Sequence, residues 1–196
     1  KYKATEGMIA LGIDVQKDYL RFVARAFVTG GHSGMYDCGT LYSWDEAAKY
    51  ADTLGALGLP VWVMVDSGYG ERTQEVYEAC LKNNFIPCKG ASTRMRTQLW
   101  AQSTINIFEG TRRQNEGQSV QLIQFDTIAM KLQLMDRMNG KGPFDWHIYS
   151  GVEGWYVKEA TAEEYDQTAD KFVVKRGRRD NHAFDAEVLC LLAAEL

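Results

Sequence analysis

The sequence lacks any long hydrophobic run. Its longest apolar stretch, Leu59–Val65 (LPVWVMV), is far too short to cross a lipid bilayer. The chain also does not open with a basic segment followed by an apolar one, the pattern of a secretory signal. We therefore expect a soluble, intracellular protein that makes no contact with a membrane.

Cysteine and proline are both scarce. The four cysteines, at positions 38, 80, 88 and 190, are widely spaced and none belongs to a CxxC pair, which argues against a structural zinc site. Reduced thiols in a cytosolic compartment are expected instead. With three prolines and no Pro/Gly/Ser-rich linker, nothing divides the 196 residues, so we expect a single domain over residues 1–196.

An excess of positive charge is also missing. Lysine and arginine number 22 against 26 acidic residues, a net charge of -4. This excludes a protein that coats nucleic acid through overall positive charge. It does not exclude a local basic path beside an acidic catalytic pocket.

Apolar periodicity and turn residues predict alternating strands and helices. Strands are expected over 8–15, 19–28, 35–42, 61–65, 85–88, 120–125, 146–149 and 171–175, and helices over 43–57, 71–83, 127–138 and 181–195, with a short helix begun by the capping box Thr161–Glu164. Residues 90–118 should be irregular, with a possible strand near 105–108. Helix 127–138 should pack through Ile128, Leu132 and Met135. Three hairpin-linked strands followed by βαβ units predict an α/β fold with a mixed sheet, three antiparallel strands and then parallel ones, and helices on both faces.

Two aspartates follow buried apolar runs. Asp14 ends the first strand and Asp66 ends the strand 61–65. Functional groups gather at the carboxyl ends of central strands, and if these two strands pair in parallel the carboxylates lie side by side. Adjacent carboxylates repel unless a divalent cation lies between them, and their oxygens suit Mg²⁺ or Mn²⁺. The alternative is that each aspartate is only a turn or cap residue.

A third group of polar residues precedes the last helix. His182 and Asp185 are three residues apart, on one helix face, and Asp180 and Asn181 are candidate N-caps. The alternative is that His182 and Asp185 serve only the helix dipole and capping. Glu187 is expected on the opposite side, facing solvent or paired.

Five segments, taken in order, resemble a known family. They are Gly12–Gln16 (GIDVQ), Val65–Tyr69 (VDSGY), Lys89–Ser92 (KGAS), Phe125–Thr127 (FDT) and Asn181–Asp185 (NHAFD). The set resembles the C-terminal nuclease domain of tailed-bacteriophage terminase large subunits, in the lambda-like branch of the RNase H-like superfamily. The resemblance implies an RNase H-like fold and an endonuclease that cuts concatemeric viral DNA during genome packaging.

The same resemblance implies roles for individual residues. Asp14 matches the first acid, Asp66 the second and Asp185 the third. His182 stands where some relatives have aspartate and others histidine, which implies an auxiliary ligand or proton-transfer group. These residues would hold two divalent metal ions, Mg²⁺ or Mn²⁺, for phosphodiester hydrolysis.

Partners are implied in the same way. They are double-stranded DNA, the terminase ATPase domain, the small terminase subunit and the portal, all in the cytoplasm of the infected bacterial host. The chain contains no G-x-x-x-x-G-K-[ST] phosphate loop, so the ATPase motor is expected to be absent from it.

Basic side chains cluster near the third acid and in the middle of the chain. The candidate DNA-binding residues are Lys89, Arg94, Arg96, Lys175, Arg176, Arg178 and Arg179, with Lys171, Arg112 and Arg113 nearby in sequence. They would hold phosphates without reading sequence, and the alternative is a merely solvated charged stretch. Trp100, Trp146 and Trp155 are expected in the core rather than stacked on bases, and Asp126 as either a helix cap or a pocket residue.

Three other functions compete with this interpretation. A Holliday-junction resolvase or a transposase core would use the same acids on the same fold. An actin-like sugar kinase shares the Gly12–Asp14 pattern, but Val15–Lys17 lacks the glycine and hydroxyl donors that cradle a nucleotide phosphate. The non-enzymatic alternative is a domain that docks DNA or a portal without cutting.

Overall fold

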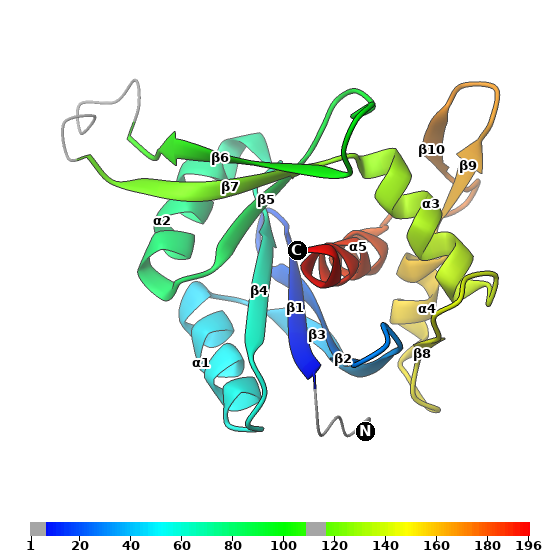
Figure 1. Cartoon of the computed structure of the whole chain (residues 1–196), viewed down its shortest axis with the longest axis horizontal. Coiled ribbons are helices and arrows are strands. Elements are labelled where there is room, and N and C mark those ends of the chain that lie inside the picture. The colour runs from blue at the N-terminus through cyan, green and yellow to red at the C-terminus, as the bar shows by residue number, and fades with distance from the viewer. Residues whose placement is uncertain (1–6, 109–116) are drawn as a thin grey trace.

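An eight-stranded mixed sheet forms the centre of the computed structural model, which describes residues 7–108 and 117–196 (Figure 1). The strand order is β6-β7-β5-β4-β1-β2-β3-β8. The strands are β1 (Gly7–Val15), β2 (Leu20–Val28), β3 (Ser33–Leu41), β4 (Val61–Asp66), β5 (Ile86–Gly90), β6 (Trp100–Asn106), β7 (Ser119–Phe125) and β8 (Trp146–His147). Strands β1, β2 and β3 form an antiparallel meander, and β4, β5 and β7 continue parallel to β1. The predicted mixed sheet is confirmed.

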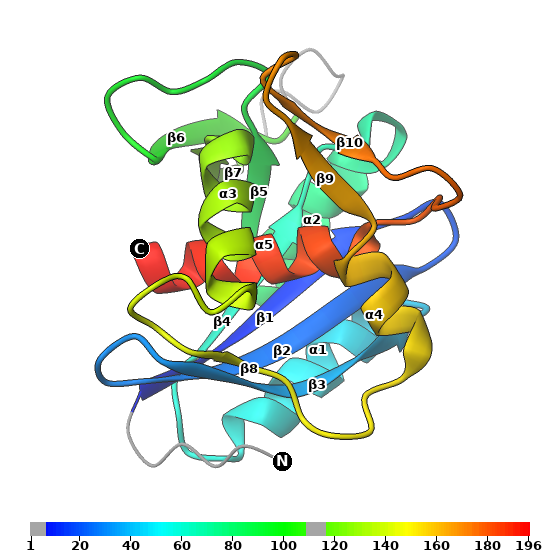
Figure 2. The same ribbon diagram turned by 90° about the vertical axis from the view of Figure 1, so that its right-hand side faces the viewer.

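Helices cover both faces of the sheet (Figures 1 and 2). One face carries α1 (Trp44–Gly55) and α2 (Thr73–Asn83), which follows the 3-10 turn η1 (Gly70–Arg72), and the other carries α3 (Thr127–Met138), α4 (Gly154–Ala160) and α5 (His182–Glu195). Helix α5 lies against β1 and β2, and α3 and α4 pack on α5. A separate hairpin, β9 (Glu163–Asp166) and β10 (Lys171–Val174), precedes α5. Among the described residues, no helix is long and apolar enough to cross a membrane.

The period of two along β1 decides which residues meet α5. Ile9, Leu11 and Ile13 belong to the apolar core under α1 and α2, whereas Ala10 belongs to the core under α5. Successive side chains alternate between the faces of a strand. Gly12 and Asp14 therefore lie on the α5 face, so the aspartate at the end of β1 points toward the helix.

Helix α5 carries apolar residues on all sides, as expected for a helix that is enclosed between the sheet and the outer helices. Ten of its fourteen residues are buried. It approaches β1 so closely that a Cβ at Gly12 would lie 2.1 Å from the carbonyl oxygen of Ala186. Only glycine at position 12 permits this approach.

A buried ion pair joins α5 to β2. Arg25 donates to both carboxylate oxygens of Glu187, at 2.9 and 2.8 Å, and both side chains are 0% exposed. The hydroxyl of Tyr156 on α4 donates to the same carboxylate at 2.5 Å, and Trp146 stacks on the guanidinium. Glu187 is thus paired, one of the two outcomes expected for it. The network ties α5 to β2, α4 and β8.

The predicted helix at Thr161 is wrong. The helix ends before it, at Ala160, and Glu163–Asp166 is strand β9. The Thr161 hydroxyl of the capping box donates to the carbonyl of Val157, and Glu163, which lies inside the box, accepts from Lys131 and Asn181. Pairing of β9 with β10 outweighs the local capping signal.

Two further predictions are wrong. The stretch 90–118, expected to be irregular with a possible strand near 105–108, contains the longer strand β6 at Trp100–Asn106. This is an edge strand whose exposed polar residues hide the usual apolar alternation. On α3 the buried face is Met130, Lys131, Leu134 and Arg137 rather than Ile128, Leu132 and Met135, which are only partly buried. Long basic side chains cover apolar surface with their stems, so they can occupy a packing face.

The Arg25–Glu187 pair yields the first prediction. The substitution Glu187→Gln leaves the Arg25 charge buried without its counter-charge, so the free energy of unfolding should fall by roughly 3–5 kcal/mol. Urea denaturation measures the change. Replacing both partners, as in Arg25→Met with Glu187→Met, should recover most of the stability.

The exposed pair Lys82–Asp45 provides the control, with side chains 70% and 74% exposed. Asp45→Asn should cost less than about 1 kcal/mol. An equally small cost for Glu187→Gln would contradict the role given to the buried pair.

Candidate active site

The carboxyl ends of β1 and β4 bring two aspartates together. The strands pair in parallel with Ile13 opposite Val65, so Asp14 and Asp66 follow one residue later at the same sheet edge. Met64 belongs to the core under α5 and Val65 to the other core, so Asp66 lies on the α5 face, as Asp14 does. The parallel pairing that would set the two carboxylates side by side is present.

Asp14 is buried and hydrogen-bonded. Its Oδ2 accepts from Gln16 Nε2 at 2.6 Å and lies 3.0 Å from His182 Nδ1. Burial raises the pKa of Asp14, and the hydrogen bond from His182 opposes that rise. Burial lowers the pKa of His182, but the hydrogen bond and charge of Asp14 outweigh it and leave that pKa raised. A histidine of the first turn of α5 is thus electrostatically coupled to the first acid.

Asp66 accepts a hydrogen bond within a turn, and it lies where its negative charge is unfavourable. Its Oδ1 accepts from the backbone N–H of Gly68 at 2.9 Å, so the expected turn role is present. Burial, together with the negative charge of Asp14, raises the pKa of Asp66 to about 7, and the Gly68 hydrogen bond opposes both effects. Asp185 adds a smaller repulsion. The turn role alone does not account for a carboxylate in such surroundings.

Asp185 enters the same site from the first turn of α5. Its Oδ1 lies 2.8 Å from Lys131 Nζ, and its Oδ2 accepts from Asn181 Nδ2 at 2.7 Å. The negative charge of Asp185 acts to raise the pKa of both Asp14 and Asp66. Three segments far apart in the chain therefore supply three carboxylates to one edge of the sheet.

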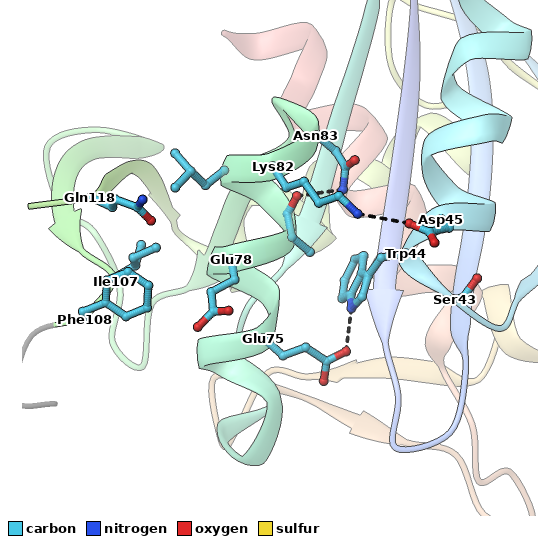
Figure 3. Close-up of a pocket in the computed structure, with 12 residues that line it drawn as sticks. Ser43, Trp44, Asp45, Glu75, Glu78, Lys82, Asn83, Ile107, Phe108 and Gln118 are labelled. Carbon is cyan, nitrogen blue, oxygen red and sulfur yellow. Dashed lines mark hydrogen bonds and ion pairs between the residues drawn. The ribbon is translucent and has the colours of Figure 1, made fainter. Parts of the chain in front are cut away.

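A cavity of about 310 Å³ opens beside two of these acids, Asp66 and Asp185. Its walls include Asp66, Lys131 and Asp185, with Gly68, Gly90, Phe125, Thr127, Val188 and Leu189 completing the lining. A larger cavity of about 590 Å³ lies elsewhere, between α1 and α2 (Figure 3). There Trp44 donates to Glu75 at 2.5 Å and Lys82 pairs with Asp45, and none of the three aspartates lines it. Of these two cavities, the smaller is the one lined by acids that the sequence predicts to be functional.

The acids do not form a ready-made metal site. Within residues 7–108 and 117–196, no three histidine, cysteine, aspartate or glutamate side chains are arranged to hold an ion. Asp14 is engaged by His182 and Gln16, and Asp185 by Lys131 and Asn181. Each of these two acids is paired with protein side-chain donors in this conformation.

The candidate DNA-binding residues divide into exposed and engaged groups. Lys89, Arg96, Arg176, Arg178 and Arg179 are exposed. Arg94 is exposed but pairs with Asp126 at 3.2 Å and Asp170 at 3.6 Å, while half-buried Lys175 donates to the carbonyl of Thr161. Arg112 and Arg113 lie outside the described residues.

Other sequence predictions have clear outcomes. Asp126 is the N-cap of α3, accepting from the backbone N–H of Ala129 at 2.8 Å. Trp146 is buried, and Trp100 and Trp155 pack against the core beneath α5, as expected. Asn181 precedes α5 as predicted, but its side chain makes no capping bond.

Sequence reasoning missed Lys131 and Glu163. It missed Lys131 because the apolar pattern of α3 indicates a different packing face. It missed Glu163 because this residue lies inside the apparent capping box Thr161–Glu164. A lysine flanked by apolar residues within a helix is the available signal for Lys131. No local signal identifies Glu163 as its partner, because the contact joins α3 to β9 across 32 residues.

Comparisons with known proteins concern the family and the fold of the chain. A family model described as "Terminase large subunit gpA, endonuclease domain" matches residues 4–196. The large terminase nuclease from thermophilic phage G20c is similar in structure, with 13% identity, a TM-score of 0.52, and 95% of this chain and 82% of that chain covered. The structure of T. thermophilus RuvC in complex with a Holliday junction substrate matches at 15% identity over 95% of this chain and 93% of that chain, but its TM-score of 0.25 carries no argument.

No curated protein matches the sequence. The predicted RNase H-like fold class is confirmed.

The raised pKa of Asp66 yields a pH prediction for the metal-free protein. Between its ordinary value of 3.8 and about 7, the folded state holds a proton that the unfolded state releases. Stability should therefore fall as pH rises through that window, and the contribution of Asp66 should be least favourable above pH 7. Asp66→Asn removes the titrating group, so at pH 8 it should be more stable than the wild type by on the order of 2 kcal/mol.

Urea denaturation from pH 4 to 8 in the presence of a chelator measures this difference. Asp45→Asn, which changes an exposed carboxylate, serves as the control and should leave the profile unchanged. Parallel pH profiles for the wild type and Asp66→Asn would refute the account of Asp66.

Proposed function

The chain belongs to the terminase large subunit gpA endonuclease-domain family, and from that premise we propose that it is a DNA endonuclease that hydrolyses phosphodiester bonds with two divalent cations, Mg²⁺ or Mn²⁺. The observation that carries the proposal is the gathering of Asp14, Asp66 and Asp185 at one edge of the sheet, where Asp66 and Asp185 line a cavity. In this proposal the chain acts as the nuclease domain.

The donor set fits hard divalent cations. All three acids offer carboxylate oxygens, the ligands that Mg²⁺ and Mn²⁺ prefer. Burial and mutual repulsion disfavour the charged form of Asp66, and a cation between the carboxylates would remove that penalty. When bound, the ions supply an activated water and charge stabilisation of the scissile phosphate and leaving oxygen.

Asp14 and Asp185 keep acceptor capacity that cations could use. Asp14 Oδ2 is held by Gln16 and His182, which leaves Oδ1 without a hydrogen bond among the described contacts. The carboxylate of Asp185 is held on both oxygens, and each oxygen keeps a further lone pair. These remaining acceptor positions would be available to shared ions while the present hydrogen bonds are kept.

His182 serves as an auxiliary proton-transfer group in this proposal. Its Nδ1 lies 3.0 Å from Asp14 Oδ2, and its Nε2 lies 3.9 Å from exposed Asp180. The ring therefore connects the first acid with the surface. A side chain in that position can pass a proton from the site to solvent.

A basic path beside the acids would hold the DNA backbone. After β10, a tight turn closed by the Arg178 N–H to the Lys175 carbonyl presents Arg176, Arg178 and Arg179 to solvent just before α5. Lys89 projects from β5 near the edge where Asp66 lies. Together with Arg94, Arg96 and Lys175, these side chains would bind phosphates without reading sequence.

The packaging role follows from the family. We propose that the substrate is concatemeric viral double-stranded DNA in the cytoplasm of the infected bacterial host. The terminase ATPase domain, the small terminase subunit and the portal would be the partners that position the nuclease on it.

Removal of the acids gives the direct test of the reaction. Asp14→Asn and Asp66→Asn should each reduce Mn²⁺-dependent nicking of supercoiled plasmid by at least about 10³-fold, because each removes a carboxylate that the transition state requires. Asp45→Asn, on the opposite face of the sheet, should cut at the wild-type rate. Circular dichroism verifies that each variant is folded.

Several results would count against the proposal. Full cleavage by either acid variant would remove that acid from the site. A wild type that never nicks plasmid, at any protein or Mn²⁺ concentration, would favour a non-catalytic docking domain. Branched DNA cut in preference to linear duplex would favour a resolvase-type enzyme.

The basic path predicts a salt effect. Replacing Arg176, Arg178 and Arg179 with glutamine should weaken binding equally to unrelated duplexes and lower the slope of log affinity against log salt by about 1 for each phosphate that is no longer neutralised. Fluorescence anisotropy at several salt concentrations measures the slope. Lys49→Gln, an exposed change on α1, is the control. An unaltered slope in the triple variant would argue for a merely solvated stretch.

A further inference from the structure

A lysine is buried beside the third acid. Lys131 lies on α3, and its side chain is 8% exposed. Its ammonium contacts Glu163 of β9 at 2.6 Å and Asp185 of α5 at 2.8 Å, and it lines the same cavity as Asp66. Lysine is almost never this buried unless paired, and one carboxylate would suffice to neutralise it. Here it joins two.

Asn181 makes a second bridge between the same two carboxylates. Its Nδ2 donates to Glu163 Oε1 at 2.8 Å and to Asp185 Oδ2 at 2.7 Å. Lys131 joins the other oxygen of each acid, Oε2 of Glu163 and Oδ1 of Asp185. Glu163 and Asp185 are therefore held face to face by two donors, with every carboxylate oxygen engaged.

We propose that Glu163, Lys131 and Asn181 form a clamp whose task is to fix the side-chain orientation of Asp185 toward the cavity and so to set the affinity of the site for divalent cations. All three are positioning residues. The inference rests on the proposed function, since it concerns how the third acid is presented to the ions.

The arrangement explains why two donors are present. A carboxylate at the start of a helix can rotate about χ1 and χ2, and a single contact leaves one of these rotations free. Bonds to both oxygens fix the plane of the carboxylate as well as its position. Groups that orient the ligands of a metal in this way typically change metal affinity or activity by about 10–100-fold when they are removed.

A purely electrostatic role for Lys131 predicts a different result. A positive charge beside the acids would compete with the cations, so its removal alone would raise their affinity. Variants that preserve net charge separate the two effects. Asn181→Ala removes one bridge without changing charge, and Lys131→Met with Glu163→Gln removes the other while cancelling one positive against one negative charge.

The experiment measures Mn²⁺ binding by isothermal titration in the absence of DNA, together with the kcat and KM of plasmid nicking. Both charge-neutral variants should bind Mn²⁺ about 10-fold or more weakly than the wild type. At saturating Mn²⁺ kcat should fall, while the KM for DNA stays the same because the basic path is intact. The matched control is Lys82→Met with Asp45→Asn, an exposed lysine–aspartate pair that should leave every value unchanged.

Asn181→Ala is the safer variant for folding, since Asn181 is half-buried and makes no side-chain cap bond. It carries the test if the double variant does not fold. Unchanged or tighter Mn²⁺ binding in folded Asn181→Ala would overturn the clamp while leaving the nuclease proposal intact. A wild type that binds no Mn²⁺ would overturn both.

Discussion

The site depends on how α5 is rotated about its own axis, and the buried pair Arg25–Glu187 determines that rotation. The helix is apolar on every side, so the hydrophobic effect buries it without choosing which residues face the strands. A bidentate ion pair has one acceptable geometry, and Tyr156 completes it. With Glu187 directed to β2, and Ala186 against Gly12, the first turn of the helix places His182 beside Asp14 and Asp185 beside Lys131. In this protein a buried polar contact specifies orientation within an apolar core.

The same packing places like charges together at a cost in stability. Asp14 and Asp66 are fixed by strand register at a buried edge, where the removal of solvent and the repulsion between carboxylates raise the pKa of both. The chain compensates in part with protein donors, His182 and Gln16 for Asp14 and the Gly68 N–H for Asp66. Such strain is typical of sites where function opposes stability. In the proposed function, a divalent cation between these carboxylates would replace their repulsion with attraction.

Much of this architecture could be predicted from sequence because its determinants are local. The apolar runs ending at Asp14 and Asp66 identify both strands and the edge at which they end. The spacing of His182 and Asp185 puts both on one helix face. What escaped prediction depends on contacts between distant segments. Glu163 lies inside an apparent capping box in the sequence, and only its pairing with Lys131 and the β10 strand reveals its position. Arg25 and Glu187 give no local sign of their partnership, which spans 162 residues.

Two sets of polar contacts therefore position Asp185, one through the helix backbone and one through its side chain. The Arg25–Glu187 pair sets the rotation of the helix backbone, which places the Cα of Asp185 but leaves its side-chain torsions free. Metal ligands must be held within about 0.5 Å of their working positions, a tolerance that backbone placement alone does not meet. The clamp of Lys131, Asn181 and Glu163 acts on the remaining torsions, and it draws on α3 and β9, elements outside the central strands. The outer helix and hairpin thus contribute to the precision of the third acid, whereas the first two acids take theirs from the sheet.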